Sequence, residues 1–492
     1  MTQPPSYGYP QQPPSAPLPP VTPSPVPAPT VPSAPAAPRP VSSLGGNFTP
    51  RRPPWRRPAV LIGLVVALLL AAGGWALWSF LGAGSSKPKG PGDAAHASAA
   101  GTVAWQAAAR VKPDEGMREA LGTWFTSTLV VKAEPDVVTA YDIKSGEKKW
   151  SFLLTGTLCA ASRESEGDVA VIAAMFGSHC MNLKAIDLRD GHRVWDELLM
   201  EEKEAGDNLD PKKWGKSGPH LALYDGHVYT TWKDGEQTRR LSDGKRVDQR
   251  KQDACEWADT TGGKRLISIT YCGESEIKLR SLDPKKLDKP KWSSSLKRND
   301  GFVSVISTDP LVLSQSPGKG GQDNRYDFVV LDPETGKEKT RVAYNSYWRL
   351  GACFLSTSGC TGALADKDSN SLYVAGQGVT MAYDLTTGKE RWTYKSDANR
   401  VTVPTAVRDG KLATYVPATA ERRGRLDYVS TTDGKVARVV EHSDRDEDRK
   451  NESKMAKVTF PRLVNGRLLL VVDGGVASDE DGVILAISAP DA

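Results

Sequence analysis

The chain has 492 residues, of which 39% are hydrophobic and 25% are charged, so it is long enough for one large folded domain with a polar appendage. The formal net charge is +5 at pH 7, and residues 1–58 contain five arginines and no acidic residue. The remainder of the chain is therefore neutral, which excludes a basic surface broad enough to indicate nucleic-acid binding.

Residues 1–58 differ in composition from everything that follows them. They hold 20 of the 35 prolines and show no hydrophobic periodicity. A segment of this kind cannot bury enough apolar surface to offset its chain entropy, so we predict a disordered Pro-rich tail with polyproline II character. The composition is typical of a flexible spacer, and the alternative is a binding segment for a proline-recognition domain.

Residues 59–82 form an uninterrupted apolar segment without a charged residue. As a helix the segment would be about 36 Å long, enough to cross a hydrocarbon core of about 30 Å. More positive charges precede it than follow it, which predicts a single-pass anchor in the lipid bilayer with a cytoplasmic N-terminus. The charged residues are Arg51, Arg52, Arg56 and Arg57 before the segment, and Lys87 and Lys89 after it.

A cleaved signal peptide is the alternative interpretation of this segment. The charged region lies far from the start of the chain and the apolar run is long for that role, so we expect an uncleaved anchor. Residues 83–100 then form a linker, and residues 101–492 form an extracytoplasmic domain.

Three copies of the pattern Asp-x3-Gly-x3-Trp occur in that domain, each directly after a short apolar alternating run. The alternating runs are predicted to be strands, because alternation places one face against a packed layer. The Asp and Gly are typical of a tight turn, since Asp can accept backbone hydrogen bonds and Gly tolerates positive φ. The Trp begins the next strand, where its ring can cover apolar surface. The copies are Asp142, Gly146 and Trp150; Asp187, Gly191 and Trp195; and Asp384, Gly388 and Trp392.

Four degenerate copies bring the number of repeats to seven, spaced about 45–53 residues apart where both glycines survive, which is the length of a four-stranded propeller blade. They are Asp332 with Gly336, Gly244 alone, Gly434 alone, and Asp283 to Trp292 without a glycine.

The two ends of the domain supply one further blade. The C-terminal run 483–488 matches the strand before a docking turn, and Gly101 and Trp105 keep the glycine-to-tryptophan spacing. We therefore predict a blade built from both ends, which closes the ring and removes exposed sheet edges. The alternative is that Trp105 is an unrelated surface aromatic.

The repeat resembles the tryptophan docking repeat of the quinoprotein-type (pyrroloquinoline-quinone-like) β-propellers, and residues 387–392 are the nearest copy. The resemblance covers about residues 101–492. It implies an all-β, eight-bladed β-propeller in which the tryptophans, Trp105 and Trp292 among them, pack between blades. The family includes calcium- and quinone-dependent dehydrogenases, non-enzymatic assembly scaffolds and sensor domains.

Its dehydrogenases carry two adjacent cysteines beside the cofactor. This chain has no adjacent pair and no assignable calcium ligand set, so we expect neither cofactor.

The six cysteines all lie beyond the apolar segment, and an even number fits an oxidising compartment. The repeat places three of them in the first strand after a docking turn and the other three later in the same blades. The alternatives are free buried cysteines or a metal site, and the absence of Cys-x-x-Cys argues against the latter. We predict the disulfides Cys159–Cys180, Cys255–Cys272 and Cys353–Cys360.

No nucleophile motif or phosphate loop stands out in the sequence. The mixed-charge run 444–450 is expected to be an exposed loop. The first hypothesis is therefore a non-catalytic scaffold or sensor that binds an envelope protein or ligand through loops at one propeller face. The alternatives are a quinone- and calcium-dependent dehydrogenase, and a transmembrane relay to a partner of the Pro-rich tail.

Overall fold

A computed structural model describes most of the propeller domain. The chain divides into two units, Met1–Gly92 and Asp93–Ala492, and every described residue belongs to the second. The tail 1–58, the apolar segment 59–82, the linker up to residue 99, and Cys353 and Cys360 therefore lie outside the described residues. Among the described residues, no helix is long and apolar enough to span a bilayer. The described ranges are 100–110, 118–201, 219–232, 235–251, 255–272, 276–297, 303–315, 325–345, 361–397, 400–457, 459–476 and 482–489.

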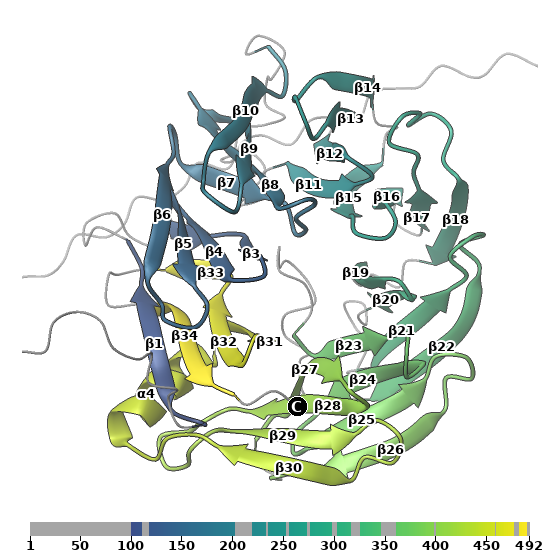
Figure 1. The fold of residues 1–492 in the computed structure, drawn as a ribbon. Coiled ribbons are helices and arrows are strands. Elements are labelled where there is room, and N and C mark those ends of the chain that lie inside the picture. Colours follow the sequence, from purple (N-terminus) through teal and green to yellow (C-terminus); the bar gives the residue numbers. More distant parts are fainter. Residues whose placement is uncertain are drawn as a thin grey trace, which may run out of the picture. The chain divides into compact units, whose positions relative to one another are not determined.

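Eight four-stranded antiparallel sheets form the blades of a β-propeller (Figure 1). The first strands of neighbouring blades contact one another, which places them innermost. Blade 1 comprises β3 (Thr123–Phe125), β4 (Leu129–Glu134), β5 (Val137–Asp142) and β6 (Lys148–Leu153); blade 2 comprises β7 (Leu158–Ala161), β8 (Val169–Phe176), β9 (His179–Asp187) and β10 (Arg193–Leu198); blade 3 comprises β11 (His220–Tyr224), β12 (His227–Trp232), β13 (Gly235–Arg240) and β14 (Arg246–Lys251); blade 4 comprises β15 (Glu256–Thr261), β16 (Ile267–Cys272), β17 (Glu276–Ser281) and β18 (Trp292–Lys297).

The second half of the ring repeats the same order of strands, and its last blade combines both ends of the domain. Blade 5 comprises β19 (Val303–Thr308), β20 (Leu311–Gln315), β21 (Arg325–Leu331) and β22 (Glu338–Asn345); blade 6 comprises β23 (Ala363–Asp366), β24 (Ser371–Ala375), β25 (Val379–Asp384) and β26 (Glu390–Lys395); blade 7 comprises β27 (Val403–Arg408), β28 (Lys411–Val416), β29 (Arg425–Ser430) and β30 (Val436–Glu441); blade 8 comprises β31 (Thr459–Val464), β32 (Arg467–Val472), β34 (Gly482–Ser488) and β1 (Val103–Ala108). A two-stranded sheet pairs β2 (Arg118–Ala120) with β33 (Gly474–Val476).

The ring closes at blade 8, where β1 pairs with β34 (Figure 1). The Gly101 N–H donates to the Ser488 carbonyl at 2.7 Å, and the Ser488 N–H donates to the Thr102 carbonyl at 2.8 Å. These bonds repeat those of the docking turn in blade 1, where Gly146 donates to Asp142 at 2.9 Å. The two chain ends thus rebuild the same turn without a covalent link, and the predicted eighth blade is confirmed.

The docking turns use Asp and Gly as their chemistry requires. In blade 6, Asp384 Oδ1 accepts the backbone N–H of Thr387 at 2.8 Å and of Thr386 at 3.0 Å. The Thr387 N–H lowers the pKa of Asp384, so the carboxylate stays ionised and holds the turn. Gly388 has φ +70°, which favours glycine.

The docking tryptophans lie between blades, each against the turn glycine of the following blade. A Cβ added to Gly191 would lie 2.4 Å from Cε3 of Trp150. Four of the five indoles also donate from Nε1 to a carbonyl of the next turn, as Trp195 does to Leu241 at 2.7 Å. The five pairs are Trp105 with Gly146, Trp150 with Gly191, Trp195 with Gly244, Trp292 with Gly336, and Trp392 with Gly434.

We expect Gly191→Ala to destabilise the protein more than Gly410→Ala, although both glycines have positive φ, +78° and +71°. The backbone strain, about 1–2 kcal/mol, is common to both variants. A Cβ at Gly410 meets nothing within 4 Å, whereas the one at Gly191 collides with Trp150 and adds about 1–3 kcal/mol of overpacking. Urea denaturation of the two variants measures the difference, and equal losses would show that the indole contact is not tightly packed.

Two of the predicted disulfides lie in the described part of the chain, and both are present. Cys159–Cys180 joins β7 to β9 with a Cα–Cα distance of 6.0 Å. Cys255–Cys272 joins the start of blade 4 to β16 with a Cα–Cα distance of 4.2 Å. Each bond pins strands within one blade, as the repeat predicted.

The expectation of an exposed loop at 444–450 is wrong, because α4 (Asp446–Met455) begins inside that run. Its first turn is acidic, which suits the positive end of the helix dipole. Glu452 and Met455 are buried on one helix face. The Glu452 carboxylate accepts from the Tyr415 hydroxyl at 2.9 Å and contacts His442 Nδ1 at 3.0 Å. Of its three buried residues, Glu452 and Met455 lie beyond the charged run on which the prediction rested, and Asp448 lies inside it.

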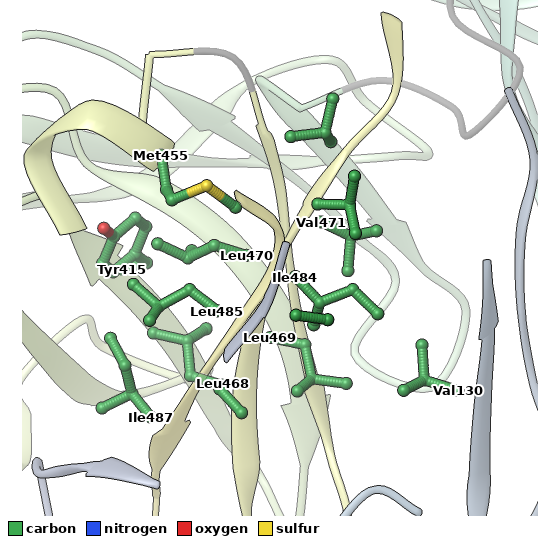
Figure 2. Close-up of a cluster of buried hydrophobic side chains, with 14 of the residues drawn as sticks. Val130, Tyr415, Met455, Leu468, Leu469, Leu470, Val471, Ile484, Leu485 and Ile487 are labelled. Atoms are coloured by element: carbon green, nitrogen blue, oxygen red, sulfur yellow. The ribbon is translucent and has the colours of Figure 1, made fainter. Parts of the chain in front are cut away.

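Met455 belongs to the hydrophobic cluster that packs the closing blade (Figure 2). Side chains of β32 and β34, among them Leu470 and Leu485, form its centre. Val130 of blade 1 and Tyr415 of blade 7 join the same cluster. The apolar packing therefore runs through the closed blade into both of its neighbours.

Candidate functional site

The propeller has two faces with different kinds of connections. One carries the docking turns and the turn between the first two strands of each blade, and residue 101 enters blade 8 there; we call it the docking face. The other carries the turns between the second and third strands and the links between blades; we call it the hairpin face. The antiparallel order of every blade dictates this division.

Polar contacts between blades tie the docking face together. The loop 162–168 of blade 2 reaches over blade 3, since Glu164 Oε1 accepts the Gly262 N–H of blade 4 at 2.9 Å. Arg163 Nη1 donates to Thr261 Oγ1 at 3.1 Å and to the Val305 carbonyl of blade 5 at 3.3 Å. Burial raises the pKa of Glu164. These groups already serve as contacts between blades, so this loop is structural.

Three exposed hydrophobic side chains on blades 1 and 2 mark the hairpin face. Leu153 is 71% exposed, Phe176 is 42% exposed and Leu198 is 36% exposed. Leu153 ends β6 and Leu198 ends β10, while Phe176 ends β8 at its turn into β9. We call these three residues the apolar patch.

The backbone brings the members of the apolar patch to neighbouring positions. The link between blades 1 and 2 lies against the β8–β9 hairpin, because a Cβ on Gly156 would lie 2.0 Å from the Met175 carbonyl. Leu153 precedes this contact by three residues, and Phe176 follows Met175. Leu198 pairs with Asn182 on β9 of the same hairpin. All three residues therefore lie on or beside one hairpin.

Large exposed apolar side chains elsewhere in the described ranges are all valines: Val247, Val401, Val436 and Val439. None of them lies in blade 1 or blade 2. Grouped exposed apolar residues mark interaction surfaces, and leucine with an aromatic neighbour offers more area for burial than single valines. The apolar patch is therefore the candidate binding site.

Within the described residues, one group of side chains has the composition of a metal site: Asp187, Asp190 and His192. Each carboxylate already has a cationic or polar partner, with Arg189 at 2.5 Å from Asp187 and His192 Nδ1 at 2.7 Å from Asp190. Arg189 lowers the pKa of Asp187, and the His192 N–H lowers the pKa of Asp190. The group is the docking turn of blade 2, and its geometry has a structural explanation.

The predicted docking residues lie at the junctions between blades, away from the apolar patch. The patch itself was not singled out from the sequence. The signal was present at Phe152 and Leu153, where two consecutive apolar residues break the strand alternation. Phe176 follows a long apolar run directly before a Gly-containing turn, so it looked like a core residue.

A family model described as outer membrane protein assembly factor BamB matches residues 92–262, a range that contains blades 1 to 3, β1 of blade 8 and β15 of blade 4. No curated protein matches the chain.

Solved structures with similar folds include BamB from Moraxella catarrhalis, at 15% identity and a TM-score of 0.44, covering 79% of this chain and 98% of that one. A computationally designed protein, Ika8, has 11% identity and a TM-score of 0.47, covering 78% and 99% of the two chains. The dihydro-heme d1 dehydrogenase NirN has 13% identity and a TM-score of 0.43, covering 79% and 76%. The docking repeat, the eight closed blades and the match over residues 92–262 together support a β-propeller built from PQQ-like repeats.

Proposed function

We propose that the protein is a non-enzymatic scaffold of the cell envelope, which binds another protein through the apolar patch. The observation that carries this proposal is the position of the exposed residues Leu153, Phe176 and Leu198 at strand ends on or beside the β8–β9 hairpin. Covering these side chains would remove apolar area from water, and Phe176 supplies the aromatic anchor typical of interface hot spots. The patch also lies within the range that matches the assembly-factor family.

The envelope address rests on three lines of support. The disulfides Cys159–Cys180 and Cys255–Cys272 suit an oxidising compartment. The matched family is described as an outer membrane assembly factor. The apolar segment 59–82, with its excess of arginines on the N-terminal side, supports a single-pass anchor with the propeller outside the cytoplasm.

Site-specific photo-crosslinking in living cells tests the binding site. A benzophenone amino acid placed singly at Leu153, Phe176 or Leu198 is expected to give the same discrete protein adduct. The same probe at Val436 or Val439, which are exposed on blade 7, serves as the matched control and is expected to give none. Adducts of equal yield at all five positions, or at none of the first three, would overturn the proposal.

A transmembrane relay to a partner of the Pro-rich tail predicts a different pattern in the same cells. In that case, deleting residues 1–50 would abolish a downstream response while leaving the patch adduct unchanged. A scaffold keeps its output without the tail. Comparing the two read-outs in one strain separates the roles.

The non-enzymatic part of the proposal concerns the quinone chemistry of the resembling dehydrogenases. Those enzymes carry adjacent cysteines, whereas the two described disulfides here link residues 21 and 17 positions apart. This spacing does not fit the dehydrogenase arrangement. Mixing the protein with pyrroloquinoline quinone and calcium is expected to leave no bound chromophore after gel filtration and no dye reduction with alcohols or sugars. A stoichiometric chromophore would favour the dehydrogenase instead.

A further inference from the structure

The junction between blades 3 and 4 departs from the docking repeat. Blade 3 has Asp248 where five of the other blades carry tryptophan, and the turn of blade 4 has no glycine. In place of a tight turn, β17 and β18 are joined by the longer segment 282–291, which we call the basic loop. It contains Lys285, Lys286, Lys289 and Lys291 together with Asp283 and Asp288, so it carries four positive and two negative charges.

The basic loop is held in a single arrangement by blade 3. Leu287 is fully buried, its N–H donates to Asp248 Oδ2 at 2.8 Å, and its carbonyl accepts from Arg250 Nη1 at 3.2 Å. Two successive turns close on either side of it, with Lys286 N–H to the Asp283 carbonyl and Lys289 N–H to the Lys286 carbonyl, both at 3.0 Å. The lysines are therefore presented from a fixed backbone.

All four lysines of the loop are exposed. Three lysines in or directly after the docking turns of other blades have carboxylate partners: Lys149 with Glu147 at 2.6 Å, Lys339 with Asp332 at 3.0 Å, and Lys435 with Asp433 at 2.9 Å.

In the basic loop, Lys285 is 4.0 Å from an exposed Asp225. Lys291 lies over the Tyr224 ring at 5.3 Å. No ion pair involves Lys286 or Lys289 within the described ranges, so the loop is a local excess of positive charge on a neutral domain.

We propose that the basic loop is a docking site for an acidic polypeptide segment of a partner protein. A fixed set of exposed lysines complements carboxylates spaced along an extended chain, and such complementarity steers association and selects partners. The Pro-rich tail is not the occupant, because residues 1–58 contain no acidic residue. The proposal does not rest on the apolar patch, which lies on other blades and the other face.

A lipid surface or a long nucleic acid fits the loop less well. The residues beyond 58 carry no net charge, so the loop is not part of a broad basic face. Leu287 is buried and the adjacent Val247 is only 38% exposed, which leaves little apolar area for insertion into a bilayer. A short acidic segment matches a basic site one loop wide.

Fluorescence anisotropy of a labelled peptide, (Gly-Asp)6, with the full-length chain in detergent tests the proposal. Binding at 20 mM NaCl is expected to weaken steeply toward 300 mM, because exposed charges are screened. The variant Lys285→Gln, Lys286→Gln, Lys289→Gln is expected to bind about tenfold more weakly. The control variant Lys149→Gln, Lys339→Gln, Lys435→Gln removes the same number of charges from paired sites and is expected to change affinity less than about twofold.

Three results would overturn the proposal. Equal losses in the two variants would show that net charge alone drives binding. If the peptide does not bind at 20 mM NaCl, the basic loop is not a docking site for acidic segments. Binding to phosphatidylglycerol vesicles or to a single-stranded oligonucleotide that is tighter than peptide binding, and that is lost with the loop lysines, would assign the loop to those ligands instead.

Discussion

Replacing Trp105 by alanine is expected to lower the free energy of unfolding by about 3–5 kcal/mol, the usual cost of removing a large aromatic from a packed site. The indole packs on Gly146, stacks on Tyr141 at 6.1 Å between ring centroids, and donates from Nε1 to the Ile143 carbonyl at 3.0 Å. β1 pairs with β34 without a covalent link between the two strands. The packing of Trp105 against blade 1 therefore also stabilises the closure of the ring.

Trp292→Ala provides the matched control, since Trp292 makes the same contact with Gly336 at a junction inside the continuous chain. Urea denaturation of the two variants is expected to give similar losses. Hydrogen exchange is expected to separate them, because Trp105→Ala should release the amides of β1 and β34 first. If Trp292→Ala exposes the amides of β1 and β34 equally, the closure of the ring does not depend on the packing of Trp105 between blades 8 and 1.

The parts of the fold that the sequence predicts are those built from local spacing. A turn needs Asp and Gly at fixed separations, and the indole needs a glycine surface in the next blade, so both leave a regular mark on the chain. The same spacing identified Gly101 and Trp105 as the missing half of a blade. Two disulfides could be paired because each bond stays within one repeat.

The features that the sequence did not predict depend on contacts between segments far apart. Glu452 of α4 contacts Tyr415 and His442, and no sequence pattern within the helix indicates these partners. The apolar patch required knowledge of which strand ends share a face. Leu153 and Leu198 lie 45 positions apart in the chain, and each lies beside the β8–β9 hairpin only in the folded ring.

At the junction between blades 3 and 4, other contacts replace the docking tryptophan that packs between blades elsewhere in the ring. Where the sequence shows only a degraded repeat, the structure contains a buried polar cluster around Glu236. Arg280 of blade 4 donates from Nη1 to Glu236 Oε1 at 3.2 Å and from Nη2 to Oε2 at 2.9 Å. Arg250 and the Tyr229 hydroxyl also bind this carboxylate. Burial, and the adjacent Glu236 charge, raise the pKa of Tyr229 well above its ordinary value.

Glu236→Ala is therefore expected to cost about 3–5 kcal/mol, because it leaves the guanidinium of Arg280 buried without its carboxylate. The loss should exceed that of an exposed pair such as Lys435 with Asp433, which contributes at most about 1 kcal/mol. Urea denaturation at pH 7 measures both. The expected loss of stability comes from the buried charge of Arg280 that Glu236→Ala leaves uncompensated. A variant that removes both charges tests this cause.

The double variant Glu236→Leu, Arg280→Leu removes both buried charges and substitutes apolar volume. It is expected to recover part of the stability lost in Glu236→Ala, since apolar replacement of a buried ion pair is often neutral or stabilising. Arg250, which is partly exposed, can turn toward solvent in that variant. A double variant no more stable than Glu236→Ala would mean that the cluster stabilises the junction through its specific hydrogen-bond geometry and not through charge compensation alone.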